Sequence, residues 1–239
     1  VQSFESASAV FLSLVSELKK MGLLLVRPFV LVYVGCIFLY ILIEQSVMSW
    51  LPSYNALILN ISAPIAIQMS ALLPAFMSIG RLMSGFLLQY VRWNIVIGVC
   101  AVAVFCLFFS VVTAAAFFSF APSTSWATAP WAAFVLPLSG IFLAPMCPIF
   151  NSLVLSAVPP ADQGLISGLI VIFSALGGAA GSVITGFVFQ AIGGAYSFYV
   201  VLIPLVGLFG GVILFNRLLQ PLQRTAQAEQ TESEEMERF

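Results

Sequence analysis

The 239-residue chain has no histidine and very few charged residues. Histidine is the commonest metal ligand and the side chain that titrates near neutral pH, so its absence argues against a histidine-based metal site or catalytic base. Only 7% of the residues are charged and 62% are hydrophobic, whereas about 25% of residues are charged in soluble domains. A soluble fold of this size could not hide so much apolar surface from water. The sequence therefore predicts a polytopic membrane protein.

Sequence features of several other functional classes are also missing. The net charge is -1, so the chain offers no basic surface for a nucleic acid. Four cysteines lie inside apolar runs without metal-site spacing, and we expect them to be small packing residues: Cys36, Cys100, Cys106 and Cys147. There is no nucleophile–base pair and no glycine-rich phosphate loop in a strand–turn–helix context. We expect no enzyme activity, no metal, no cofactor and no nucleic-acid partner.

Six apolar runs are long enough to cross a bilayer, which needs about 20 helical residues. The runs are continuous, unlike the alternating segments of about ten residues that form membrane barrels, so we predict helices. The predicted spans are 28–51, 64–89, 93–118, 131–157, 165–190 and 196–218. Three prolines, Pro137, Pro145 and Pro148, should bend the fourth helix because each removes a backbone donor.

Basic residues occur on only one side of this predicted bundle. They precede the first span, flank the turn after the second and follow the sixth: Lys19, Lys20, Arg27, Arg81, Arg92, Arg217, Arg224 and Arg238. The opposite loops, 52–63, 119–130 and 191–195, have no lysine or arginine. This pattern predicts that both termini are cytoplasmic, in a plasma membrane or a bacterial inner membrane.

The two ends of the chain differ from the apolar spans. We predict that residues 1–27 form a cytoplasmic linker with an amphipathic helix on the membrane interface. Its apolar face would consist of Phe4, Phe11, Leu14, Val15 and Leu18. Residues 219–239 are polar and rich in glutamate, and we predict a disordered cytoplasmic tail.

Glu44 is a carboxylate in the middle of an apolar run, FLYILIEQSVMSW. An ionised glutamate at bilayer depth costs about 2.5–3.5 kcal/mol on insertion scales, so it needs water, a partner or a substrate. Glu44 could carry a proton, or it could bind a substrate hydroxyl or cation. Alternatively, it could lie near the outer interface and simply reach water.

Other polar or aromatic side chains could line the same cavity: Tyr40, Gln45, Trp50, Gln68 and Asn151. Tyr40 shares a helical stripe with Glu44, and Tyr40 and Trp50 could stack on a sugar. Gln68 could instead form an interhelical hydrogen bond, and Asn151 could have a packing or capping role.

The segment GRLMSGFLLQYVRW, Gly80 to Trp93, resembles the signature loop of the major facilitator superfamily. Gln89 and Tyr90 replace the acidic residue and the following arginine of that motif. Gly80 and Gly85 would let two helices approach closely. Arg81 could anchor the helix end or act in gating, and Arg92 would flank the cytoplasmic turn.

Two further segments carry this resemblance. The segment from Pro159 to Gly194 is similar to the tenth and eleventh helices of these transporters, with Gly177 and Gly181 on one packing face. The segment from Phe38 to Tyr54 resembles the seventh helix of fucose permease-like sugar–proton symporters.

The resemblance implies an all-α membrane fold, a six-helix bundle that forms half of a twelve-helix transporter. Its partners would be an amino-terminal six-helix half, lipid, a small-molecule substrate and a proton. It also implies secondary active transport of a small polar solute, with a sugar as candidate, by alternating access. The alternatives are an exporter of drugs or apolar metabolites, and a non-transporting scaffold or sensor.

Overall fold

The computed structural model describes residues 16–237, and it confirms the prediction of an all-helical membrane bundle. In this part of the chain, six helices or helix pairs are long and apolar enough to cross a membrane. They are α2 (Pro28–Leu57), α3 (Ala63–Ser70) with α4 (Leu72–Leu87), α5 (Trp93–Phe117), α6 (Ala132–Leu143) with α7 (Met146–Ser156), α8 (Pro160–Ala191) and α9 (Tyr199–Glu237). Residues 16–25 form a further helix before α2.

Proline explains the two interrupted spans. A proline inside a helix clashes with the carbonyl four residues earlier. Pro74 opposes the Ser70 carbonyl, and the second span breaks between α3 and α4 at this place. Pro148 likewise opposes the carbonyl of Ala144, where α6 gives way to α7. The bend predicted for the fourth helix is therefore a full interruption.

Three helices are longer than the sequence predicted. Helix α2 continues past Pro52 to Leu57, because a helix in lipid satisfies the other backbone groups even where proline removes one donor. Helix α8 begins at Pro160, since proline is well suited to a first helical position. Helix α9 stays helical to Glu237, where we expected disorder from residue 219. The tail is rich in strong helix formers such as alanine, glutamine and glutamate.

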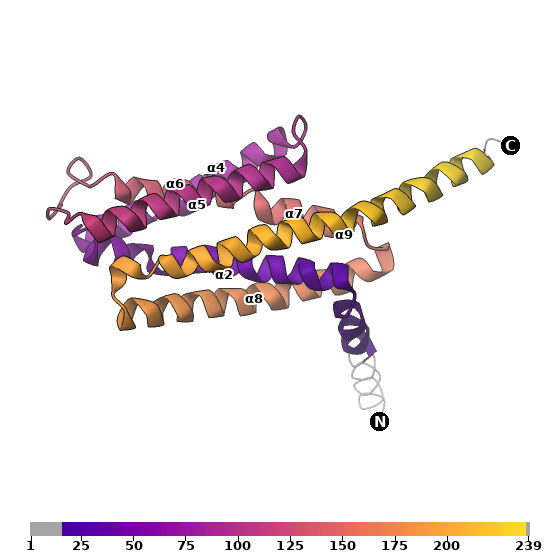
Figure 1. Cartoon of the computed structure of the whole chain (residues 1–239), viewed down its shortest axis with the longest axis horizontal. Helices are drawn as coiled ribbons and strands as arrows, with labels where there is room; N and C mark the ends of the chain where they lie inside the picture. The colour runs from indigo at the N-terminus through magenta and orange to yellow at the C-terminus, as the bar shows by residue number, and fades with distance from the viewer. Residues whose placement is uncertain (1–15, 238–239) are drawn as a thin grey trace, which may run out of the picture.

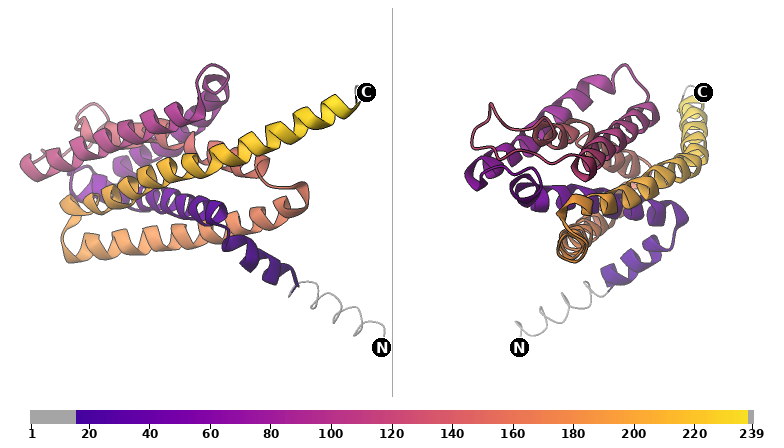
Figure 2. Two further views of the ribbon diagram at one scale, coloured as in Figure 1. Left: turned by 45° about the vertical axis from the view of Figure 1, so that its right-hand side comes forward. Right: turned by 60° about the vertical axis from the view of Figure 1, so that its left-hand side comes forward.

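The helices form two groups. Figure 1 shows α4, α5 and α6 on one side of the bundle and α2 with α8 on the other, and Figure 2 shows the same grouping. Helix α2 packs against α8 and α9, α4 packs against α6, and α5 packs against α6 and α9. Helix α9 therefore connects the two groups. Helices α2 and α4 are not among the closely packed pairs of the described residues.

The start of the described chain and the end of α9 lie at the same end of the bundle (Figure 1). An even number of spans requires this arrangement. Four residues of the predicted amphipathic face, Phe4, Phe11, Leu14 and Val15, lie outside the described residues.

At the opposite end, the loop between α5 and α6 is tied to the loop before α3. Ile61 and Ser123 form a parallel bridge, and the Ser62 N–H donates to the Ser123 carbonyl at 2.8 Å. Asn60 adopts a positive φ of 51°, and its side-chain amide donates to the Phe120 carbonyl. These bonds hold the loop across the end of the bundle.

Candidate functional site

Glu44 lies close to the middle of α2. It is 16 residues beyond Pro28, or about 24 Å along the helix axis, and its side chain is 13% exposed. Because α2 is longer than predicted, Glu44 is farther from the Leu57 end of the helix than the sequence suggested. The geometry does not support a carboxylate that simply reaches water at the outer interface.

Arg81 of α4 is the partner of this carboxylate. Its Nη2 atom lies 3.6 Å from Glu44 Oε1, and its side chain is 54% exposed. The distance exceeds that of a direct N–H···O hydrogen bond, so charge attraction holds the pair. Glu44 and Arg81 are also the most interior charges of the six spans, since Asp162 and Arg217 lie within a turn of a span end. The guanidinium thus reaches toward α2, a contact that the sequence interpretation did not predict.

The ion pair connects two helices whose most extensive packing is with different neighbours. Helix α2, with Glu44, belongs to the group of α8, whereas α4, with Arg81, belongs to the group of α6. A contact between the groups at this depth is sensitive to any movement of one group relative to the other. This arrangement makes the pair a candidate switch.

Tyr40 lies one helical turn before Glu44 and is fully buried. Its hydroxyl lies beside the Glu44 carboxylate but makes no hydrogen bond of good geometry with the described residues. A buried polar group without a partner is costly. The ring face of Tyr40 is covered in this structure, so it is not available for stacking on a sugar.

Asn151 is tied to α2 through another tyrosine of the same stripe. The Tyr33 hydroxyl donates to Asn151 Oδ1 at 2.7 Å, and Asn151 Nδ2 donates to Cys147 Sγ at 3.7 Å. Cys147 in turn lies close enough to Glu44 for an electrostatic interaction. Asn151 thus joins α7 to α2, in place of the capping role considered from sequence.

Gln45 and Trp50 face α8 instead of Arg81. The Gln45 side chain lies against Gly178. The Trp50 indole donates to the Ser182 carbonyl at 2.9 Å and stacks on Phe189, with ring centroids 5.4 Å apart. Trp50 therefore packs between helices, and its ring is not free for a sugar.

Gln68 is exposed and lies near the Ala63 end of its span. Its Oε1 atom accepts a hydrogen bond from the Trp126 indole at 3.1 Å. Thirteen residues, about 20 Å of helix, separate it from Arg81. The structure therefore brings Tyr40, Glu44 and Arg81 together, with Asn151 beyond Cys147, and leaves Gln68 outside.

Glycines bring the helices of each group into backbone contact. A Cβ at Gly177 would lie 2.5 Å from the Phe38 carbonyl oxygen, and one at Gly181 would collide with the Leu42 carbonyl. The Ser46 hydroxyl donates to the Gly181 carbonyl at 3.0 Å. These contacts join α2 to α8 without room for a larger side chain.

The other group has a similar seam. A Cβ at Gly80 would collide with the Ile141 backbone, and one at Gly140 would lie 2.8 Å from the Leu73 carbonyl oxygen. Gly85 differs, because a Cβ there would meet nothing within 4 Å. The prediction that Gly85 permits close helix approach is therefore wrong for this structure. Arg92 is exposed and precedes the first residue of α5, at the turn after α4.

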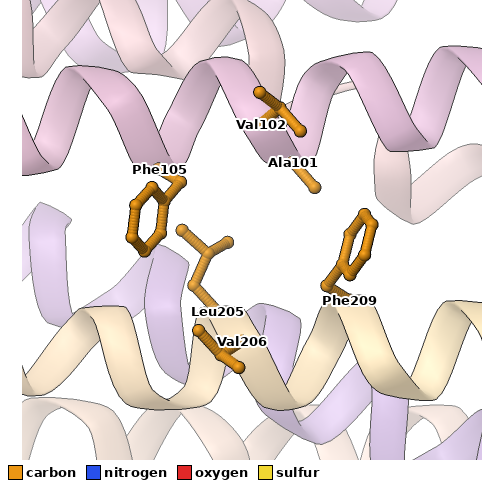
Figure 3. Close-up of a pocket in the computed structure, with 6 residues that line it drawn as sticks. All are labelled: Ala101, Val102, Phe105, Leu205, Val206 and Phe209. Carbon is orange, nitrogen blue, oxygen red and sulfur yellow. The ribbon is translucent and has the colours of Figure 1, made fainter.

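The gap between α5 and α9 holds a pocket of about 200 Å³. Figure 3 shows its six lining side chains, all apolar: Ala101, Val102, Phe105, Leu205, Val206 and Phe209. A pocket without polar groups offers no hydrogen bonds to a polar solute. We therefore place the candidate site at Glu44 and Arg81.

Two parts of the site were not found from the sequence. Tyr33 shares the stripe of Glu44, but only the fold places Asn151 opposite its hydroxyl. The pairing of Glu44 with Arg81 also went unpredicted, although they are the one acid and the one base in the interior of the spans. Opposite charges in the interior of different spans are a signal that could have suggested it.

A comparison with protein families agrees with the helical architecture. The family model described as Major Facilitator Superfamily matches residues 3–182. The chain belongs to the major facilitator superfamily. Members of this superfamily are membrane transporters, so this chain is a multi-pass membrane transport protein. Its partners are lipid and a small-molecule substrate. Neither the curated proteins nor the solved structures gave a match.

Proposed function

We propose that the protein is a proton-coupled secondary active transporter of a small polar solute, in which Glu44 carries the proton. The observation that supports this most is the ion pair itself. A carboxylate that is 13% exposed, near the middle of a membrane-spanning helix, lies 3.6 Å from a guanidinium of the other helix group. Such a carboxylate is retained at a cost of a few kcal/mol, which is typical of functional groups in membranes.

Protonation of Glu44 would remove the charge that holds Arg81. The pair has no direct hydrogen bond at 3.6 Å, so its attraction depends on the negative charge. Neutral Glu44 could then hydrogen-bond the Tyr40 hydroxyl, which lies beside it and has no partner of good geometry among the described residues. In this way one proton would change the contact between α2 and α4.

The glycine seams would convert this local change into movement of helix pairs. Helix α2 would move with α8, and α4 would move with α6, because backbone contacts join each pair. We propose that these six spans work together with a second six-helix bundle, an amino-terminal half, and that the solute site lies between the bundles near the midplane. Alternating access would follow from the relative motion of the bundles.

A sugar is the first candidate substrate because of the resemblance of α2 to sugar–proton symporters. The buried ring of Tyr40 and the stacked ring of Trp50 supply no free aromatic surface for it. We therefore propose that Glu44 and Arg81 face the solute by charge and hydrogen bonding, and that the second bundle supplies other contacts.

Uptake in proteoliposomes tests the coupling role of Glu44. The protein, Glu44→Gln and Glu44→Asp are reconstituted with an imposed pH gradient, and labelled hexoses or the dye ethidium serve as solutes. We expect Glu44→Gln to abolish gradient-driven accumulation while exchange between equal solute pools persists. Glu44→Asp should retain part of the accumulation because it keeps an ionisable carboxyl.

The outcomes separate the proposed function from its alternatives. Full accumulation by Glu44→Gln would reject Glu44 as the proton carrier. Gradient-driven movement of ethidium, without hexose transport, would favour the exporter. Absence of flux for every solute, in a correctly folded protein that includes both six-helix bundles, would favour a scaffold or sensor.

A further inference from the structure

A polar pocket lies at the cytoplasmic end predicted from the charge pattern, away from Glu44. Its volume is about 190 Å³, and it is lined by Lys20, Leu23, Leu24, Arg27 and Asp162. The first four residues belong to the helix of residues 16–25 and the turn into α2, and Asp162 lies in the first turn of α8. The pocket therefore forms where two separate parts of the chain meet.

The three charged side chains around the pocket do not pair with one another. Among the described residues, none of Lys20, Arg27 and Asp162 forms an ion pair. Lys20 and Arg27 are exposed, and Asp162 is half-buried. Two cations and one carboxylate that share a pocket without pairing leave room for a ligand with both an anionic group and a hydrogen-bond donor.

The surroundings of the pocket suit lipid. Leu18 and Leu23, on a helix that also carries lysines, are 62% and 66% exposed, and Val26 in the turn after it is 77% exposed. Exposed apolar residues beside basic residues are typical of a helix that lies in the membrane interface. Met21 holds this helix against α8, since its Cε atom lies 3.3 Å from where a Cβ at Gly168 would be.

We infer that this pocket binds the headgroup of a phospholipid that carries an N–H or O–H donor. The phosphate lies between Lys20 and Arg27, and the headgroup donor bonds the Asp162 carboxylate. The acyl chains run along Leu23 and its exposed neighbours. Basic pockets at the ends of membrane helices bind headgroups in this manner, and the assignment is independent of the transport proposal.

Native mass spectrometry of the delipidated protein tests this site. The protein is titrated separately with phosphatidylethanolamine, phosphatidylglycerol and phosphatidylcholine of the same acyl composition. Phosphatidylcholine has the phosphate but no donor, so we expect it to bind several-fold more weakly than the other two. Asp162→Ala should remove this preference.

Two further variants distinguish lipid binding in the pocket from attraction by general surface charge. The double variant Lys20→Gln/Arg27→Gln should lower binding of all three lipids roughly thirtyfold, because each basic residue near the surface contributes about one kcal/mol and every 1.4 kcal/mol is about tenfold in affinity. Lys19→Gln is the matched control, since Lys19 is on the same helix but does not line the pocket. It should weaken binding far less than the double variant does.

Several results would overturn the inference. An effect of the double variant no larger than that of Lys19→Gln would mean that the pocket is not the site. A headgroup preference that survives in Asp162→Ala would remove the role of the carboxylate. Displacement of the lipid by millimolar inorganic phosphate would identify a site for a free anion instead of a lipid.

Discussion

At the scale of single residues, the protein places a largely buried acid beside a half-exposed base at a distance too long for a direct hydrogen bond. Glu44 is 13% exposed and Arg81 is 54% exposed. The free-energy cost of leaving one charge without its partner therefore differs between the two residues. Without Glu44, the guanidinium can still be hydrated. Without Arg81, the carboxylate stays in a largely apolar place and must take up a proton or be destabilised.

This asymmetry gives a double-mutant cycle a definite outcome. We expect Arg81→Gln to lower the thermal unfolding midpoint in detergent more than Glu44→Gln does, because it leaves the more buried partner alone. The double variant should recover part of the loss, with a coupling free energy of about 0.5–3 kcal/mol. Strictly additive losses would show that the two side chains do not interact in the folded protein.

The sequence predicted Glu44, Tyr40 and Asn151 as site residues, and the structure gathers these around one stripe of α2. The sequence could not predict that Trp50 stacks on Phe189 or that Gln68 accepts a hydrogen bond from Trp126. Periodicity tells which residues share a face of a helix. Which neighbour that face meets depends on packing between segments more than 50 residues apart.

At the scale of helices, two glycine seams join the helices of each group. Gly177 and Gly181 join α2 to α8, and Gly80 and Gly140 join α4 to α6. Sequence reasoning predicted the six spans from their apolar length, but gave Gly80 and Gly85 the same role. Only the fold distinguishes them, because Gly80 faces the Ile141 backbone and Gly85 faces open space.

The two signature-loop glycines therefore make a matched pair of variants. Gly80→Ala should lower the free energy of unfolding by about 1–3 kcal/mol, since the added methyl group overpacks a backbone contact. Gly85→Ala should cause no loss, because alanine also favours the helical state by up to about 1 kcal/mol. Thermal unfolding followed by circular dichroism measures both, and equal losses would contradict the seam between α4 and α6.

At the scale of the whole molecule, the six spans place both ends of the described chain at the same end of the bundle (Figure 1). The distribution of lysine and arginine predicts which side of the membrane that end faces, since the loops at the other end have none.

Reporter fusions in a bacterial host test this orientation. Alkaline phosphatase, which is active only outside the cytoplasm, should be active when inserted in the loop at residues 119–130. The same enzyme inserted in the turn after α4, near Arg92, should be inactive. The reverse pattern would place the termini outside and would move the proposed lipid site to the other leaflet.

The unequal exposure of the ion pair also bears on which cation could drive transport. The guanidinium of Arg81 lies 3.6 Å from the Glu44 carboxylate and is the more exposed of the two groups. A hydrated sodium ion would have to displace this fixed positive group and shed its water before it met the carboxylate oxygens. A proton needs only a momentary chain of water molecules, so access alone would select protons over metal cations, without any dedicated filter.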